Sequence, residues 1–241
     1  MQNIDVGAVP IYRTERRAQV VSYSVPFLQV CAAMLMMREE YGGPYNVRTL
    51  QDVLAKNLTV ATNRRGIVRK NLRRASDTVQ QQVNQRLETH DRGTFVETVS
   101  EGVDRTKSDM NFVFLLPDVV ANYVSNRQPC SLKVVNVELM QESFALLVNN
   151  DSPALLQRIN RAIISLSQQG VIEKLYRKWW NIDTGCDAQR LETGHKSVRS
   201  PAVLNEGYST NSMSSFRLDF SNILTFVWSL VTILHIVFTM Q

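Results

Sequence analysis

Residues 220–240 (FSNILTFVWSLVTILHIVFTM) contain no Asp, Glu, Lys or Arg. Of these 21 residues 14 are apolar, and as an α-helix they would extend about 31 Å, close to the roughly 30 Å hydrocarbon core of a bilayer. The Ser, Asn and Thr side chains can bond to their own helix, and His235 is the one ionisable group of the segment. The segment therefore predicts a single transmembrane helix, and a buried helix of a soluble domain is the alternative.

The net charge of +5 comes from one short stretch of the remaining chain. Residues 61–75 (ATNRRGIVRKNLRRA) hold six basic residues and no acidic one: Arg64, Arg65, Arg69, Lys70, Arg73 and Arg74. Outside that stretch 21 basic and 22 acidic residues nearly cancel, which excludes a generally basic nucleic-acid-binding protein. The spacing of the basic run predicts a solvated helix face, and binding to phosphates, acidic lipids or a nuclear importer is the alternative.

Apolar runs alternate with helical patterns along the rest of the chain. Strands are expected at 30–37, 58–62, 111–116 and 143–148, and helices at 50–56, 67–76, 77–89, 118–126, 153–169 and 171–180. The helix over 153–169 has the clearest signals, because Ser152 can cap it, Pro153 suits its first position and Gly170 follows it. This alternation predicts an α/β fold. Residues 187–219 are expected to link this body to the membrane helix.

The sequence contains no motif of a known catalytic or metal site. Its three histidines, His90, His195 and His235, are never spaced at i, i+4, and HExxH, GxSxG, GxGxxG, CxxC and phosphate-loop patterns do not occur. We therefore expect no enzymatic activity, no cofactor and no bound metal.

The three cysteines predict different roles. Cys31 lies in an apolar run and is expected to be a small core residue. Cys130 and Cys186 lie in expected loops and could form a disulfide worth about 4 kcal/mol in an oxidising compartment, with two separate thiols as the alternative. Asn57 and Thr59 frame an N-glycosylation acceptor sequence, which makes Asn57 a candidate site.

Three stretches in order resemble the ligand-binding core of ionotropic glutamate receptors, a clamshell related to periplasmic solute-binding proteins. Residues 8–27 (AVPIYRTERRAQVVSYSVPF) are similar to the family's A-P-L-T, then Arg, then V-I-D-F-S-x-P-F. Residues 98–130 (TVSEGVDRTKSDMNFVFLLPDVVANYVSNRQPC) resemble E-G-V, Y-A-F-L-L-E-S and a final P-C. Residues 162–186 (AIISLSQQGVIEKLYRKWWNIDTGC) resemble L-x-L-x-E-x-G, K-W-W and a final Cys. The resemblance covers nearly the whole chain.

The resemblance implies a clamshell with an incomplete first lobe, followed by one C-terminal transmembrane helix at 220–240. Residues 1–37 and 151–186 would form the first lobe, and residues 45–150 the second. The family inserts three more membrane segments, including the pore loop, after the strand that matches 30–37, whereas here REEYGGPYNVRTLQDVL follows directly. The expectation is a single-pass membrane subunit or fragment of a ligand-gated cation channel that does not conduct ions alone. In the family the ligand core is extracellular at the plasma membrane.

The resemblance also implies which residues of the first lobe hold a ligand. Arg17, seven residues after Pro10, matches the arginine that binds the α-carboxylate, and a guanidinium suits that role because its paired N–H donors fit a carboxylate. The Pro10 carbonyl would accept from the α-amino group, and Tyr12 replaces the family's threonine. The alternative is a surface arginine in a run with Arg13 and Arg16.

The second lobe departs from the family's pattern at two positions. The family's Gly-Ser-Thr at a helix start aligns with Gly66, Ile67 and Val68, which keep the backbone N–H groups and lack both hydroxyls. The carboxylate that pairs with the ligand ammonium aligns with Pro117, and Asp118 is its neighbour. These losses argue against glutamate and leave a smaller or more apolar acid, or a vestigial site, as alternatives.

The implied partners are a small amino or carboxylic acid, a membrane, and other receptor subunits, which are tetrameric in the family; nucleic acid is not among them. The resemblance further implies that Cys130 and Cys186 are bonded, and an extracellular core would expose Asn57 to glycosylation. Two functions without channel activity are the alternatives: a membrane-tethered solute-binding protein, and a tail-anchored adaptor that uses the basic run.

Overall fold

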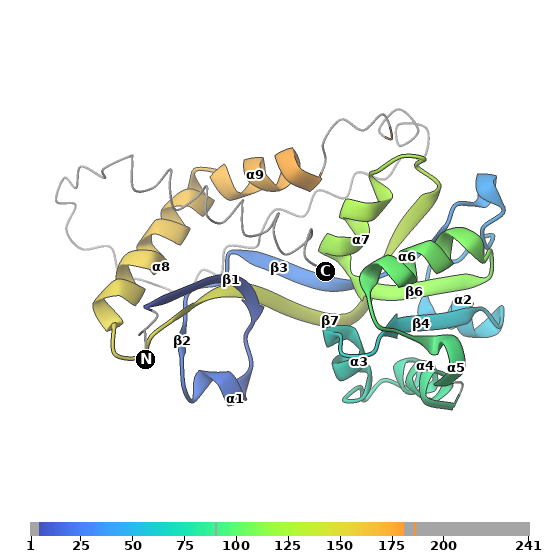
Figure 1. The fold of residues 1–241 in the computed structure, drawn as a ribbon, viewed down its shortest axis with the longest axis horizontal. Coiled ribbons are helices and arrows are strands. Elements are labelled where there is room, and N and C mark those ends of the chain that lie inside the picture. The colour runs from blue at the N-terminus through green and yellow to red at the C-terminus, as the bar shows by residue number, and fades with distance from the viewer. Residues whose placement is uncertain (1–4, 90, 181–185, 187–241) are drawn as a thin grey trace. The chain divides into compact units, whose positions relative to one another are not determined.

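The computed structural model describes residues 5–89, 91–180 and 186, which divide into two compact units. Unit 1 comprises the described residues up to 29 together with 143–175. Unit 2 comprises the described residues within 30–142 together with 176–180 and 186. The chain passes from one unit to the other within the strands β3 (Leu28–Met37) and β7 (Leu132–Val148), and within the helix α9 (Val171–Trp180) (Figure 1).

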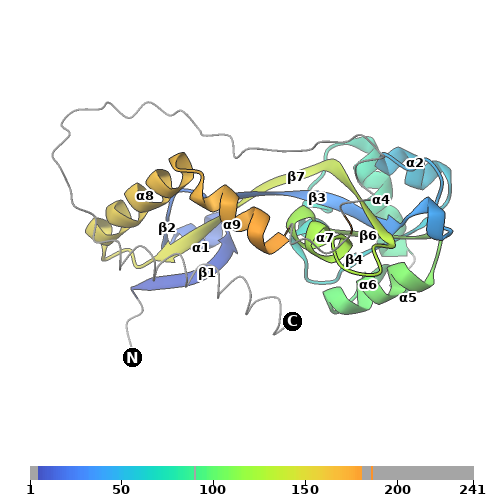
Figure 2. The ribbon, with the colours of Figure 1, turned by 90° about the horizontal axis from the view of Figure 1, so that it is seen from above.

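Unit 1 consists of short strands on the end of β7 and a long helix. The strands β1 (Val6–Tyr12) and β2 (Ser22–Tyr23) both pair antiparallel with β7, and α1 (Glu15–Ala18) connects them. The helix α8 (Pro153–Gln168) follows β7 (Figure 2). Ile159 and Ile163 of α8 pack in one buried cluster with Phe27, Leu146 and Val148.

Unit 2 is built around the strand β6 (Phe112–Pro117), whose residues 112–116 are all buried. β6 pairs antiparallel with β3 and parallel with β4 (Thr59–Asn63), which pairs parallel with β5 (Phe95–Val96). The surrounding helices are η1 (Glu39–Tyr41), α2 (Leu50–Ala55), α3 (Ile67–Leu72), α4 (Thr78–Thr89), α5 (Asp91–Thr94), α6 (Val99–Ser108) and α7 (Asp118–Ser125).

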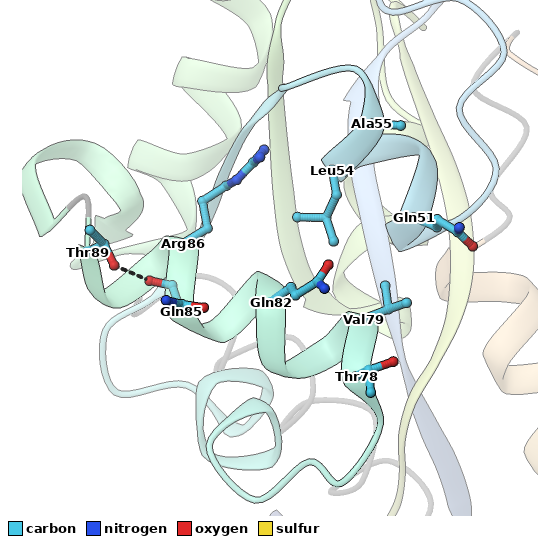
Figure 3. A pocket seen from close by; sticks show the side chains of 9 residues that line it. All are labelled: Gln51, Leu54, Ala55, Thr78, Val79, Gln82, Gln85, Arg86 and Thr89. Carbon is cyan, nitrogen blue, oxygen red and sulfur yellow. Dashed lines mark hydrogen bonds between the residues drawn. The ribbon is translucent and has the colours of Figure 1, made fainter.

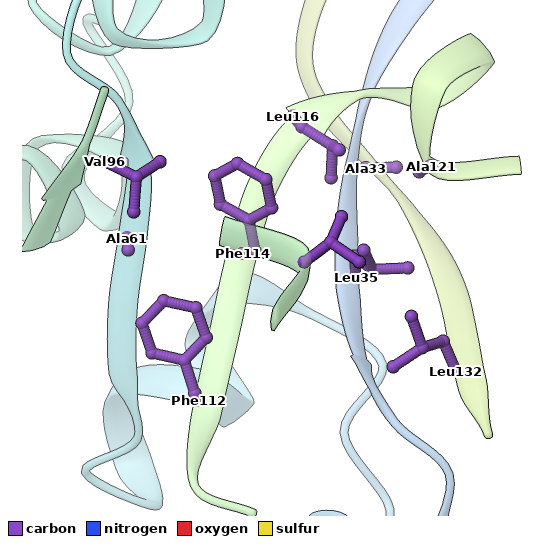
Figure 4. Close-up of a cluster of buried hydrophobic side chains, with 10 residues drawn as sticks. Ala33, Leu35, Ala61, Val96, Phe112, Phe114, Leu116, Ala121 and Leu132 are labelled. Atoms are coloured by element: carbon purple, nitrogen blue, oxygen red, sulfur yellow. The ribbon is translucent and has the colours of Figure 1, made fainter. Parts of the chain in front are cut away.

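One core cluster of unit 2 contains ten buried residues, which come from the strands β3, β4, β5, β6 and β7 and the helices α6 and α7 (Figure 4): Ala33, Leu35, Ala61, Val96, Val103, Phe112, Phe114, Leu116, Ala121 and Leu132. Gly102 of α6 lies directly against the ring of Phe114, so that an added Cβ would overlap the ring. Glycine is therefore required at this position for α6 to approach the sheet.

Local signals fix where several of these helices begin. Thr49 and Asp52 form a capping box at the start of α2, in which each side chain bonds to the other's backbone N–H. Thr98 caps α6 by accepting from the Glu101 N–H at 3.2 Å. Pro153 occupies the first turn of α8, although the Ser152 side chain makes no capping bond.

The predicted α/β fold is confirmed, and the structure adds elements that the patterns did not predict. Only the second half of β7 was expected, because residues 132–142 carry charged and amide side chains on their exposed positions. The helix α6 was missed since its sequence VSEGVDRTKS has few apolar residues. Residues 30–37, which we expected in the first lobe, belong to unit 2, where β3 pairs with β6.

The predicted transmembrane helix at 220–240 and the predicted linker at 187–219 lie outside the described residues. Within the part of the chain that the structure describes, no helix combines the length and hydropathy needed to span a bilayer.

Candidate functional site

Arg17 lies on the surface of unit 1, in the short helix α1 that follows β1. Its side chain is exposed, and its guanidinium Nη1 donates to the backbone carbonyl of Tyr12 at 3.4 Å. Among the described residues no carboxylate forms an ion pair with Arg17. The structure thus brings together two of the residues predicted to hold a ligand and leaves the guanidinium accessible to an anion.

Pro10 lies in the irregular part of β1. The pairing with β7 runs from Gly7 opposite Leu147 to Ile11 opposite Ala145, so β1 gains two residues over its partner between these pairs. Such bulges interrupt the ladder and re-aim backbone groups. The ring of Tyr12, at the end of the strand, packs against Phe144 with the ring centroids 4.7 Å apart.

In unit 2 the predicted residues follow the ends of two parallel strands. β4 and β6 are paired in parallel, with Thr62 opposite Leu115, so the segments after them begin at the same edge of the sheet. Ligands bind at such carboxyl edges in open α/β sheets. Gly66 is the N-cap of α3 after β4, and Asp118 begins α7 after β6.

The side chains at these positions are engaged within unit 2. Val68 is 1% exposed and belongs to the interior, so only its backbone could contact a ligand, whereas Ile67 is half-buried. Asp118 Oδ1 accepts from the N–H of Cys31 at 3.0 Å and from the N–H of Val119 at 2.8 Å. Because Ala32 pairs with Pro117, this carboxylate continues the hydrogen bonding between β3 and β6 by one residue. Pro117 itself is the N-cap of α7.

The predicted disulfide is present in unit 2: Cys130 and Cys186 are bonded, with their Cα atoms 5.5 Å apart. Cys31 is not disulfide-bonded and is half-buried. Trp180 lies near the same end of the chain, where its Nε1 donates to the Val119 carbonyl at 2.7 Å and its own carbonyl accepts from Asn126 Nδ2 at 2.9 Å. These contacts attach the last residue of α9 to α7 and its C-cap.

Asn57, the predicted glycosylation site, lies in the turn between α2 and β4. Its side chain is exposed and its φ of 52° places it in the left-handed region. Asparagine is among the few residues that adopt this conformation readily. Attachment of a sugar stays a prediction.

A cavity of about 720 Å³ lies between α2 and α4 in unit 2 (Figure 3). Its lining is mainly amide and hydroxyl side chains: Gln51, Leu54, Ala55, Thr78, Val79, Gln82, Gln85, Arg86 and Thr89. Arg86 Nη1 donates to the Leu58 carbonyl at 3.4 Å. The cavity contains none of the predicted ligand residues, and the described residues include no cluster of three or more His, Cys, Asp or Glu that could hold a metal ion.

The basic run is partly paired, which the sequence did not indicate. Arg69 and Arg73 bond to Glu88, and Arg64 bonds to Glu97. Burial raises the pKa of Glu88, but the hydrogen bonds and charges of Arg73 and Arg69 outweigh it, so this pKa lies below its ordinary value. The carboxylates come from α4 and from the segment after β5, and only the tertiary structure brings them to the run.

The fold defines a periplasmic-binding-protein-like class, and comparison with known proteins gives the family. The family model for bacterial extracellular solute-binding proteins, family 3, matches residues 1–182. The chain therefore belongs to this family.

Several known proteins are similar to this chain. Glutamate receptor 3 of Mus musculus is 30% identical over 155 residues, which cover 63% of this chain and 17% of the receptor. Glutamate receptor 3 of Homo sapiens is 30% identical over 130 residues, 53% of this chain and 14% of the receptor. The solved structure titled "Drosophila muscle GluRIIB complex with glutamate" shares the fold, with a TM-score of 0.61 and 24% identity over 73% of this chain and 68% of that one. The chain thus spans less than a fifth of the length of the receptors it matches.

Proposed function

We propose that this chain is the ligand-recognition part of a subunit of a ligand-gated cation channel related to the glutamate receptors. In this proposal it binds a small amino or carboxylic acid in the cleft between two lobes that the resemblance implies. Without further subunits it conducts no ions. The relationship to glutamate receptor 3 and the solute-binding family support the class of function.

The observation that carries the proposal is the state of Arg17. Its guanidinium is exposed, is oriented by the Tyr12 carbonyl, and forms no ion pair with the described carboxylates. A guanidinium in this state can accept a carboxylate in a bidentate geometry, which adds both affinity and orientation.

The choice of ligand follows from the residues of unit 2. Ile67 and Val68 offer no hydroxyl to a distal carboxylate, and Pro117 offers no charge to an ammonium group. Asp118 already bonds to two backbone N–H groups. We therefore propose a monocarboxylic acid with a short or apolar remainder in preference to glutamate.

Titration calorimetry on the full chain in detergent tests the binding step, with butyrate, glycine and glutamate as probes. We expect butyrate to bind more tightly than glutamate. Arg17→Ala should weaken butyrate binding about 10- to 100-fold, because a hydrogen bond to a charged group contributes about 1.5–3 kcal/mol. Arg16→Gln, in the same exposed helix, is the matched control and should leave the affinity unchanged. Equal weakening by both variants would contradict the role of Arg17.

A recording experiment tests the channel step separately. The chain expressed alone should give no current under the acid that binds, whereas co-expression with full-length glutamate receptor subunits should change their currents and allow co-purification. A current from the chain alone, or the absence of any association with receptor subunits, would contradict this part of the proposal.

A further inference from the structure

A cavity of about 220 Å³ in unit 2 is lined by seven residues. One is Gly66, and the other six are basic: Arg64, Arg65, Arg69, Lys70, Arg73 and Arg74. Two of the cations precede α3, and the other four lie on or just after it. Positions 66, 69, 70, 73 and 74 follow the i, i+3, i+4 spacing that gathers side chains on one helix face. The spacing of the basic run predicted a solvated helix face. The structure shows that these residues line a cavity.

Three of the guanidiniums are held in place by the surrounding structure. Arg69 Nη2 bonds to both oxygens of Glu88, at 3.1 and 3.2 Å, and its Nη1 donates to the Arg64 carbonyl at 3.0 Å. Arg64 Nε donates to Glu97 at 2.7 Å, and Arg73 Nε donates to Glu88 at 3.0 Å. Positioned cations bind an anion with less loss of side-chain entropy than mobile ones do.

An aromatic ring provides a second support for two of these groups. The guanidinium carbon of Arg69 lies 4.0 Å from the centroid of the Phe95 ring, and that of Arg64 lies 5.1 Å from it. Phe95 itself is 7% exposed, so the ring is fixed in the core. Cation–π contacts of this kind orient the charged planes as well as stabilise them.

The cavity carries an excess of positive charge. Its six cations face two bonded carboxylates, Glu88 and Glu97, which leaves a net charge of +4. The side chains of Arg65, Lys70 and Arg74 are exposed and form no ion pair with the described residues. Gathering like charges is unfavourable unless a counter-anion occupies the space between them.

We propose that this cavity binds a compact anion that carries two phosphate groups. Two phosphate monoesters carry about three to four negative charges at pH 7, which matches the excess charge of the cavity. The planar forks of arginine suit phosphate oxygens, and the small volume favours a compact anion over a long polymer. The phosphates could belong to a free metabolite or to a lipid headgroup. The cavity shares Gly66 with the residues that the resemblance assigns to a ligand, and anion binding there does not involve the Arg17 guanidinium.

Calorimetric titration of the full chain in detergent with inorganic pyrophosphate tests the proposal. We expect saturable binding at 50 mM NaCl that weakens as salt rises. The triple variant R65Q/K70Q/R74Q should bind about tenfold more weakly or worse, since it removes three charges that make no ion pair in the described structure. R48Q/K56Q/K107Q removes three exposed cations elsewhere in unit 2 and should bind like the unchanged chain.

The triple variant could lose binding because it folds poorly. The single charge reversal Arg74→Glu controls for this effect and should also weaken binding. No saturable binding of pyrophosphate, or equal weakening in the control triple variant, would overturn the proposal. Arg17→Ala should leave pyrophosphate binding unchanged, and loss of binding in that variant would overturn the claim that the Arg17 guanidinium is not involved.

The source of the phosphates is decided by a second titration with dioctanoyl phosphatidylinositol bisphosphate. Binding at least tenfold tighter than that of pyrophosphate identifies a lipid headgroup, and comparable or weaker binding identifies a free phosphate compound. In either case R65Q/K70Q/R74Q should lose affinity for both probes, and a lipid affinity that this variant leaves unchanged would overturn the proposal for the lipid.

Discussion

In unit 1 one buried cluster, formed by Phe27, Leu146, Val148, Ile159 and Ile163, joins β7 and α8, whereas unit 2 is built around β6, whose residues 112–116 are all buried. The predicted ligand residues of the two units also differ in their exposure and hydrogen bonding. In unit 1 Arg17 is an exposed side chain on a four-residue helix. In unit 2 Val68 is part of the interior and Asp118 bonds to the backbone of β3. The comparison teaches that the predicted ligand residue Arg17 of unit 1 is exposed, while Val68 and Asp118 of unit 2 take part in the packing and hydrogen bonding of their own unit.

The largest expected effect comes from the core of unit 2. Phe114→Ala should lower the free energy of unfolding by about 3–5 kcal/mol, since it removes a fully buried ring from the middle of β6. Tyr45→Ala is the control, because Tyr45 is 76% exposed, and it should change stability by less than about 0.5 kcal/mol. Urea unfolding measures both values.

The Phe114→Ala variant also tests whether the two units unfold separately. Amide hydrogen exchange should speed up within unit 2, whereas the N–H groups of Ser24 and Phe27, which bond to Leu146 and Phe144 in unit 1, should keep their protection. Equal loss of protection in both units would show that they unfold as one.

The disulfide is the next largest contribution: both its cysteines lie in unit 2, and the loop that it closes includes residues 143–175 of unit 1. Replacing Cys130 and Cys186 by serine should lower stability by about 2–4 kcal/mol, because the bond closes a long loop, with a sequence separation of 56, in the unfolded chain. Cys31→Ser, at the cysteine outside the disulfide, should have a smaller effect. Thermal unfolding with and without a reductant checks the prediction, and an unchanged midpoint for the double variant would contradict it.

Substitutions of Asp118 test whether its carboxylate stabilises unit 2 or binds a ligand. Asp118→Ala should cost about 1–3 kcal/mol of stability, because the N–H groups of Cys31 and Val119 lose their acceptor. Asp118→Asn keeps an acceptor oxygen and should recover most of that loss. If instead Asp118→Ala leaves stability unchanged and abolishes binding of butyrate, then Asp118 serves the ligand and the comparison fails.

The smallest effect is the pH dependence of Glu88 in unit 2. Its pKa is lowered in the folded state, so its contribution to stability is present above the ordinary carboxyl pKa and is lost as pH falls through the lowered value. Glu88→Gln should therefore reduce stability at pH 7 by about 1 kcal/mol or less and have no effect near pH 2. Glu138→Gln, at an exposed position, is the control. A difference that persists unchanged at pH 2 would exclude this ion pair as the cause.

Much of the fold could be predicted because its elements carry local signals. The run LQVCAAMLMM forms β3 and the run FVFLLP forms β6, since both are apolar and buried. Pro153 and Gly170 marked the ends of α8 closely. Residues 132–142 of β7 and the helix α6 could not be predicted in this way, since charged and amide side chains interrupt the apolar positions of the first and α6 has few apolar residues.

The sequence by itself determined the α/β class and the pair of cysteines that could bond, because apolar patterning and the positions of the cysteines in expected loops indicate these. The residues of a ligand site followed from the resemblance to a family. Only the tertiary structure decided what each side chain does there. It directs the Asp118 carboxylate to the amide of Cys31, buries Val68, and brings Glu88, Glu97 and Phe95 to the basic run. The physical reason is that a charged or apolar side chain takes its role from its neighbours in space, and those neighbours come from segments far apart in the chain.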